Sequence, residues 1–394
     1  MTQINKHKIT LYLLLLLVSL LSAVITLGQE KPEVQFGGAL RFNYNLSSWK
    51  EGQKARGGDF GYDLFRINSI AAYKGVKLNA EYRLYSQAFG GGMLKQGWIG
   101  YDFTPERNLQ IGLTQVPFGI TQYNSNNWFF NMTYYVGLED DHDMGIKYTY
   151  TGERWDFALA FFKNAEELIF GSYSDVSDSR YSYDVSSIDL DGDGLPDLRN
   201  KETNQVNGKL VRKFQNGQFI HMLGMSGQYG GLYNLDTGET GSHHAYAVHY
   251  EMQAGRIIVE AQLAGYGHNP ENQPEETDDA VAMTAYGAPY LVAADGIVYT
   301  LNLSWSLPVD WNPVSNLQFY NDFGYLSKAS PDYNDSYMNV TGVLVTAGSV
   351  YTYIDAAAGK NHSWLGPEWM NALAEGTENA SWHVRFNINL GYYF

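Results

Sequence analysis

The sequence of 394 residues contains no cysteine. That absence excludes a disulfide scaffold, a zinc–cysteine site, thiolate catalysis and a lipoprotein anchor. Charge is scarce and one-sided, with 26 Lys and Arg against 42 Asp and Glu. The net charge of −16 argues against nucleic acid as a partner, because a nucleic-acid-binding face is basic. Aromatic residues are abundant at 15%, and 31 of them are tyrosines, which is typical of a folded chain rather than a disordered one.

Long apolar runs are missing everywhere except at the N-terminus. A basic stretch at 6–8 precedes an apolar run at 9–27 that ends in small residues. This is the pattern of a secretory signal peptide, so we expect residues 1–28 to be cleaved and residues 29–394 to form one domain. The run is long enough to span a bilayer as a helix, and an uncleaved anchor is the alternative. Any further membrane crossing has to be made by strands.

The rest of the chain alternates apolar and polar residues with a period of two. Segments 34–45 and 76–85 show this pattern, and the last fourteen residues show it most clearly. The apolar side of that last segment consists of Trp382, Val384, Phe386, Ile388, Leu390, Tyr392 and Phe394. Such alternation predicts strands with two different faces, as in a membrane barrel or a soluble sandwich.

Three further features favour the barrel. The strands are about ten residues long, as a tilted membrane strand requires. Their apolar faces end in aromatic residues, and short connections alternate with long ones. We therefore predict an all-β transmembrane antiparallel barrel of about sixteen strands, with short periplasmic turns and long extracellular loops. The hairpin at 338–355 and the stretch at 281–292 leave fourteen or eighteen strands as alternatives. A barrel of this size generally encloses an aqueous lumen.

Several motifs resemble the phosphate-selective porin O/P family, in its Bacteroidetes-type members. They lie at Gln110–Gly119, Asn321–Leu326, Tyr351–Asp355 and Gly359–Gly366. The resemblance implies a homotrimeric porin of the Gram-negative outer membrane that carries small anions such as phosphate. The terminal Phe394 resembles the signal by which the barrel-assembly machinery recognises its clients. Where the family signature carries lysine, this sequence has Thr114, which leaves the ion selectivity open.

The polar faces of the strands identify the residues expected to line the pore. The basic ones are Arg41, Arg66, Lys77, Arg83, Lys147 and Arg385. The four arginines fall on neighbouring strands, each about seven to nine residues from its periplasmic end, so we predict a belt at one height near mid-pore. The belt either forms an anion pathway or braces the barrel by pairing with acids such as Glu81. Acids on the tenth, eleventh and thirteenth strands should form an opposed wall: Glu251, Glu260 and Asp322.

One long connection, residues 117–143, is rich in aromatic residues and asparagine. It starts with Pro117, Phe118 and Gly119 and contains Trp128. A loop with this composition should fold into the lumen and constrict it. Its acidic end, residues 139–143, is either a solvated loop tip or a cation site.

A second long connection contains a calcium-loop pattern. The expected ligands are Asp189, Asp191, Asp193, the Leu195 carbonyl and Asp197, with glycine at the sixth position for the turn. We expect a structural calcium ion in this extracellular loop; the alternative is an acidic loop without metal.

The sequence therefore predicts a passive channel for small hydrophilic solutes, mildly anion-preferring, with phosphate as a candidate. A non-conducting barrel that acts as an adhesin or scaffold through its outer loops is the alternative. No enzyme is predicted, because His243, His244, His249 and the pair His362–Ser363 lack the spacing of a hydrolase site. The expected surroundings are outer-membrane lipid and lipopolysaccharide, since the acidic excess lies in the outer loops.

Overall fold

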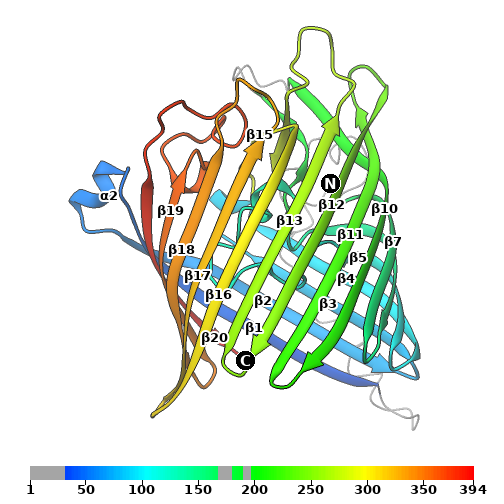
Figure 1. Ribbon diagram of the computed structural model, residues 1–394, viewed down its shortest axis with the longest axis vertical. Helices are drawn as coiled ribbons and strands as arrows, with labels where there is room; N and C mark the ends of the chain where they lie inside the picture. Colours follow the sequence, from blue (N-terminus) through cyan, green and yellow to red (C-terminus); the bar gives the residue numbers. More distant parts are fainter. Residues whose placement is uncertain (1–31, 167–179, 190–196) are drawn as a thin grey trace, which may run out of the picture.

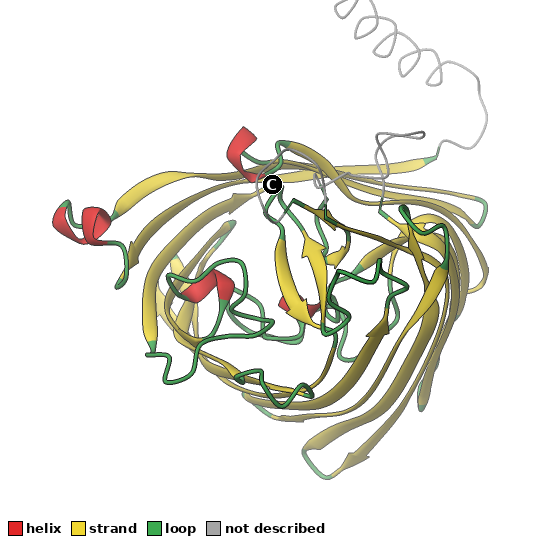
Figure 2. Cartoon of the chain, turned by 90° about the horizontal axis from the view of Figure 1, so that it is seen from above, coloured by secondary structure: helices red, strands yellow, loops and turns green. Residues whose placement is uncertain are grey.

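The computed structural model describes residues 32–166, 180–189 and 197–394. In these residues sixteen long strands follow one another around a barrel (Figures 1 and 2). They are β1 (Glu33–Ser47), β2 (Asp59–Tyr73), β3 (Val76–Leu84), β4 (Gly92–Thr104), β5 (Arg107–Gln115), β6 (His142–Thr151), β7 (Trp155–Ala165), β10 (Leu198–Asn216), β11 (Phe219–Asn234), β12 (Thr240–Ala254), β13 (Ile257–Asn269), β16 (Asp295–Trp311), β17 (Val314–Lys328), β18 (Ser336–Ala347), β19 (Val350–Lys360) and β20 (His383–Tyr393). The predicted signal peptide lies outside the described residues. No helix in the described part is long and apolar enough to cross a membrane.

The barrel is closed by its first and last strands. β20 pairs antiparallel with both β19 and β1, and every other neighbouring pair is antiparallel as well. Beyond the last strand, the Phe394 N–H donates to the Gly38 carbonyl at 3.1 Å and the Gly38 N–H donates to the Phe394 carbonyl at 2.9 Å. The prediction of a closed antiparallel barrel with sixteen strands is confirmed.

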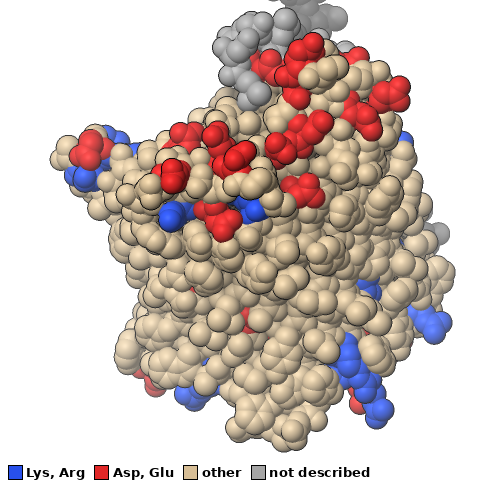
Figure 3. Space-filling model, turned by 45° about the horizontal axis from the view of Figure 1, so that its top comes forward, with Lys and Arg blue, Asp and Glu red and all other residues tan. Residues whose placement is uncertain are grey.

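The outward faces of the strands are apolar. Phe36 is 70% exposed and Phe394 63%, whereas Asn387 and Asn389, on the other face of β20, are buried. Figure 3 shows few charged side chains over the body of the barrel and a concentration of acidic ones at the end that carries the long connections. A broad exposed apolar surface of this kind suits contact with lipid.

Short turns join the strands at one end of the barrel and long connections join them at the other. A typical turn is Lys74-Gly75, where both residues have positive φ, a conformation that glycine adopts without strain. The hairpin of β18 and β19 belongs to the barrel. The stretch 281–292 does not: it contains β14 (Ala280–Thr284) and β15 (Tyr290–Ala293), which form a separate small sheet with β8 (Asp184–Val185).

The long connections pack an apolar core inside the barrel (Figure 2). This core joins Phe129 and Met132 from the β5–β6 connection, Met283 from β14, and Leu365 and Leu373 from the β19–β20 connection; each is at most 3% exposed. Part of the lumen is therefore filled with folded protein, which differs from the expected continuous aqueous lumen. The apolar residues of these connections have no strand or helix period, so the sequence pattern does not reveal that they are buried.

Candidate functional site

The connection between β5 and β6, residues 116–141, crosses the inside of the barrel, and we call it the inward loop. The Gly119 N–H donates to Ser226 Oγ on β11 at 2.9 Å, and the Ile120 N–H donates to Gln262 Oε1 on β13 at 2.7 Å. Pro117 and Phe118 are buried, and Trp128 packs against the internal core. The loop thus leaves one wall and is fastened to the wall opposite, inside the lumen.

Asp322 on β17 holds the middle of the inward loop. Its carboxylate accepts hydrogen bonds from the Asn126 N–H at 2.7 Å, from Asn126 Nδ2 at 2.8 Å and from Asn127 Nδ2 at 2.7 Å. We predicted Asp322 to be a pore-lining acid of the opposed wall. Its carboxylate instead accepts hydrogen bonds from the loop, and only 1% of the residue is exposed.

Glu251 and Glu260, the other two acids of that wall, stand directly opposite each other on β12 and β13. Glu260 Oε2 accepts a hydrogen bond from Asn302 Nδ2 at 3.3 Å. These two acids remain on the wall opposite the arginines, as the strand count predicts.

A cavity of about 800 Å³ lies between the inward loop and the wall that β20, β1, β2 and β3 form. We call it the arginine cavity, because Arg41, Arg66, Arg83 and Arg385 all line it. Of the residues that the structure describes, the acidic ones lining it are Asp59 and Asp63. More than half of the lining side chains are aromatic, and most of those are tyrosines.

Three of the four arginines pair with carboxylates. Arg41 Nε lies 2.9 Å from Asp63 Oδ2, whereas Arg66 Nη1 and Arg83 Nε lie 3.6 Å and 2.7 Å from the same Glu81 oxygen. Arg385 differs, since its Nε donates to the neutral amide oxygen of Asn45 at 2.9 Å. The belt therefore combines the two predicted roles: the side chains face the cavity, and neighbouring acids brace most of them.

Aromatic rings fix the guanidinium groups. The Arg83 guanidinium carbon lies 4.4 Å from the centre of the Tyr181 ring, and that of Arg66 lies 5.2 Å from the Tyr393 ring. Stacking of this kind restricts the guanidinium plane while leaving its N–H edge free to donate.

The four arginines do not share one height. Arg385 stands opposite Ser47, six positions along β1 from Arg41, which is about 20 Å along the strand. The prediction of one common height is wrong because the ends of neighbouring strands are staggered. The last residue, Phe394, pairs with Gly38, which lies five residues after the start of β1. Counting residues from each strand end ignores this stagger.

The two predicted pore lysines lie elsewhere. Lys77 follows the turn at 74–75 and pairs with Asp102 at 2.5 Å. Lys147 Nζ donates to the Gln115 carbonyl at 2.6 Å, next to the start of the inward loop. Neither lines the arginine cavity.

The acidic run at 139–143 is not a solvated loop tip. Every residue from Glu139 to Asp143 is at most 6% exposed. Because the inward loop returns through the lumen, its end is enclosed by the other long connections. Burial raises the pKa of the Glu139 carboxyl to about 8.

The predicted calcium loop falls mostly outside the described residues, including Asp191, Asp193 and Leu195. Its two ends are described and lie together. The Asp197 N–H donates to the Ile188 carbonyl at 2.7 Å, and Leu198 pairs with Ile188 where β9 (Ser187–Ile188) meets β10.

No protein-family model and no curated protein matches the chain. Solved structures do. OmpT of Vibrio cholerae in its trimer form is 12% identical, with a TM-score of 0.54 over 92% of this chain and 99% of that one. The anion-selective porin from Comamonas acidovorans is 12% identical, with a TM-score of 0.55 over 92% and 100%. The outer membrane channel DcaP of Acinetobacter baumannii is 8% identical, with a TM-score of 0.56 over 92% and 97%. The fold is that of the outer-membrane porins.

Two of the histidines considered for a hydrolase site lie in different elements of the described barrel. His249 lies on β12, 3.7 Å from Glu251, and His362 lies in the β19–β20 connection. Neither His362 Nε2 nor the Ser363 hydroxyl has a hydrogen-bond partner, so the two adjacent residues are not linked to each other.

Two features of the barrel lumen escaped the sequence reasoning. Asp63 is a β-bulge residue: Arg41 pairs with Leu64 and Phe42 pairs with Tyr62, so Asp63 has no pairing partner on β1. The bulge turns its carboxylate toward Arg41. The tyrosines of the arginine cavity come from seven separate connections and strands. Their only signal in the sequence is the high tyrosine content.

Proposed function

We propose that this protein is a passive outer-membrane channel for small hydrophilic solutes with a mild preference for anions. The charge of the arginine cavity carries this proposal, since four arginines face two aspartates there. Guanidinium groups donate paired hydrogen bonds to carboxylate and phosphate, and three of the four are already partly neutralised. The preference is therefore mild.

Phosphate is one candidate solute, together with small organic anions. Membership of the phosphate-selective porin O/P family is part of this proposal and rests on the motifs quoted above. Thr114 stands where that family carries lysine, and it lies opposite Asp143 rather than in the arginine cavity. Phosphate selection in this chain would accordingly depend on the arginines.

Single substitutions of Arg41, Arg66, Arg83 and Arg385 by Ala test the proposal. Reversal potentials in a planar bilayer under a KCl gradient should shift toward cation selectivity, most for Arg385, which has only an amide partner. Lys77→Ala is the matched control, because Lys77 is basic but lies near the short turns. Unchanged reversal potentials in all four arginine variants would leave bracing as their only role.

A non-conducting barrel is the second candidate, and the internal core favours it. Buried side chains from four connections fill part of the lumen, and a sealed barrel of this kind would act through its outer loops as an adhesin or scaffold. Liposome swelling distinguishes the two: a channel admits small sugars and a sealed barrel does not.

Three accompanying features belong to the same proposal. The chain is exported by a cleaved signal peptide. The barrel-assembly machinery recognises Phe394 and inserts the barrel into an outer membrane that contains lipopolysaccharide. It assembles as a homotrimer, as OmpT of Vibrio cholerae does in its trimer form. A structural calcium ion occupies the 189–197 loop, whose ends the β9–β10 pairing brings together. Mass spectrometry of the mature chain and light scattering in detergent test the first two.

A further inference from the structure

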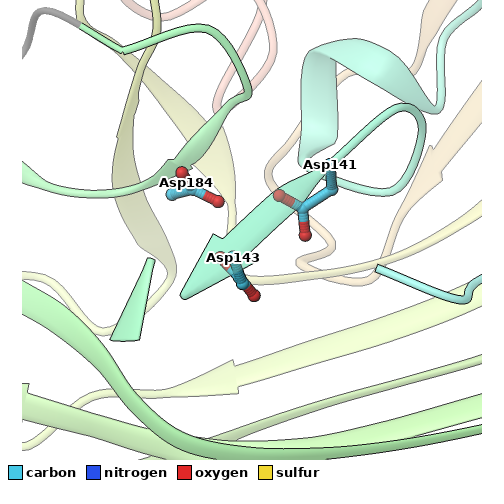
Figure 4. A group of neighbouring side chains, drawn as sticks. All are labelled: Asp141, Asp143 and Asp184. Carbon is cyan, nitrogen blue, oxygen red and sulfur yellow. The ribbon is translucent and has the colours of Figure 1, made fainter. Parts of the chain in front are cut away.

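Three aspartates from two separate segments of the chain meet inside the barrel. Asp141 ends the inward loop, Asp143 lies on β6 and Asp184 lies on β8 of the small internal sheet. One carboxylate oxygen from each lies within 4.8 Å of the other two, and all three residues are at most 6% exposed. In Figure 4 the carboxylates of Asp141 and Asp184 face each other, with Asp143 beneath them.

The cluster has too little positive charge around it. Glu202 on β10 and Glu166 add two more buried carboxylates. Among the described residues, the guanidinium beside the cluster is that of Arg180, 3.4 Å from Asp184 Oδ2. Burial and the neighbouring carboxylates raise the pKa of Asp141 and of Asp184. Buried like charges at this spacing require protons or a cation.

The other two carboxylates of the acidic run, those of Asp140 and Glu139, do have partners in the lumen. Asp140 has a counter-ion, since Lys95 Nζ lies 2.6 Å from its Oδ2. Glu139 accepts hydrogen bonds from the Asn124 N–H and from the Thr133 hydroxyl. Asp141 Oδ1 and Asp143 Oδ1 have no hydrogen-bond partner at all.

Two polar side chains next to the cluster also have oxygen atoms without a hydrogen-bond partner. Gln205 Nε2 donates to Asp143 Oδ2 at 3.2 Å, which directs this amide at the cluster, and its Oε1 is buried without a partner. Thr114 stands directly opposite Asp143 on β5, and its hydroxyl is likewise buried and unpartnered. Buried oxygen atoms without a hydrogen-bond donor, beside three clustered carboxylates, are groups that a cation can bind.

A small cavity lies beside the cluster. This cavity, of about 10 Å³, lies next to Asp141; Glu202, His243 and His268 line it as well, whereas Asp143 and Asp184 do not. That is room for about one water molecule or one ion. Ca²⁺ binds oxygen ligands at about 2.4 Å, so ligand oxygens on opposite sides of it lie up to about 4.8 Å apart.

We propose that Asp141, Asp143 and Asp184 bind one Ca²⁺ ion inside the barrel, with Gln205 or Glu202 completing the oxygen ligands. The ion would fasten the end of the inward loop to the small internal sheet. This site is separate from the calcium loop at 189–197, which shares none of these residues.

Calcium titration of the folded, full-length mature protein tests the proposal. Isothermal titration calorimetry of the Asp141→Asn/Asp143→Asn variant should show one Ca²⁺ fewer per chain than the native protein. The matched control, Asp191→Asn/Asp193→Asn, changes the outer loop and should keep the internal ion. Equal numbers of bound Ca²⁺ in the native protein and in the Asp141→Asn/Asp143→Asn variant would overturn the proposal.

A second variant guards against a folding defect. Thr114→Lys places an ammonium group opposite Asp143, where it should replace the ion. We expect this variant to bind one Ca²⁺ fewer and to melt in EDTA at a higher temperature than the native protein does in EDTA. If Ca²⁺ raises the melting temperature of Thr114→Lys and of the native protein equally, the internal site is not there.

Discussion

Arg66 and Arg83 stand directly opposite each other on β2 and β3, and one carboxylate, that of Glu81, contacts both. Two like charges at opposed positions of a sheet repel each other unless an acid lies between them. Glu81 therefore sets how much of this positive charge the arginine cavity presents to a solute.

Replacing Glu81 by Gln should increase the anion selectivity. The substitution leaves both guanidinium groups without their shared acid, and Arg83 is only 5% exposed. We expect a loss of stability on the order of 3 kcal/mol, because a buried charge loses its partner. Reversal potentials and chemical denaturation measure the two effects. Asp102→Asn, which removes the acidic partner of Lys77 near the short turns, should leave the reversal potential unchanged. An unchanged reversal potential in folded Glu81→Gln would contradict the role given to this pair.

Replacing Asp322 by Ala should release the inward loop. Three hydrogen bonds to a buried carboxylate are lost, at a cost on the order of 3 kcal/mol. Single-channel conductance should rise and become noisier, because the loop no longer stays against β17. Asp332→Ala, in the exposed β17–β18 connection, is the control. A conductance identical to that of the native protein would mean that the loop does not limit the pore.

Glu139 should make the stability of the inward loop depend on pH. Its pKa is raised by burial to about 8 from an ordinary 4.5, so the folded state binds its proton more tightly than the unfolded state. This contribution to stability is fully present below about pH 4.5 and is lost as pH rises through 8. The melting temperature of the native protein should fall relative to that of Glu139→Gln between pH 5 and about 8.5. Parallel curves would show that the carboxyl titrates normally.

Removing Phe394 should impair assembly more than folding. Its side chain is 63% exposed and packs little, although its backbone pairs with Gly38. We expect a reduced amount of barrel in the outer membrane of cells and near-normal refolding in detergent. Heat-dependent mobility in electrophoresis measures both. A refolding yield that falls as steeply as the cellular amount would assign Phe394 to barrel closure instead.

The barrel could be predicted because its strands obey one simple rule. Each barrel strand presents one face to an apolar surrounding, so apolar and polar residues alternate along segments such as 382–394. The inner side of the lumen follows no such rule. Asp322 has the spacing of a pore-lining acid, and only the path of the inward loop across the lumen turns it into an anchor.

The acidic cluster illustrates the same limit. Asp141 and Asp143 are two residues apart, but Asp184 and Glu202 come from the next connection and from β10. The path of two irregular connections brings them together, and no local pattern encodes it. The stagger of the strands likewise separates Arg385 from Arg41, although each lies at a similar distance from its own strand end.

Single-channel recording of the refolded native protein in a planar bilayer, under a KCl gradient, tests the central claim most directly. An open pore past the arginine cavity predicts stable conductance steps with a reversal potential on the anion side. An absence of steps from protein with the barrel's heat-dependent mobility would contradict the claim and identify a sealed barrel. A reversal potential on the cation side would contradict the role of the four arginines.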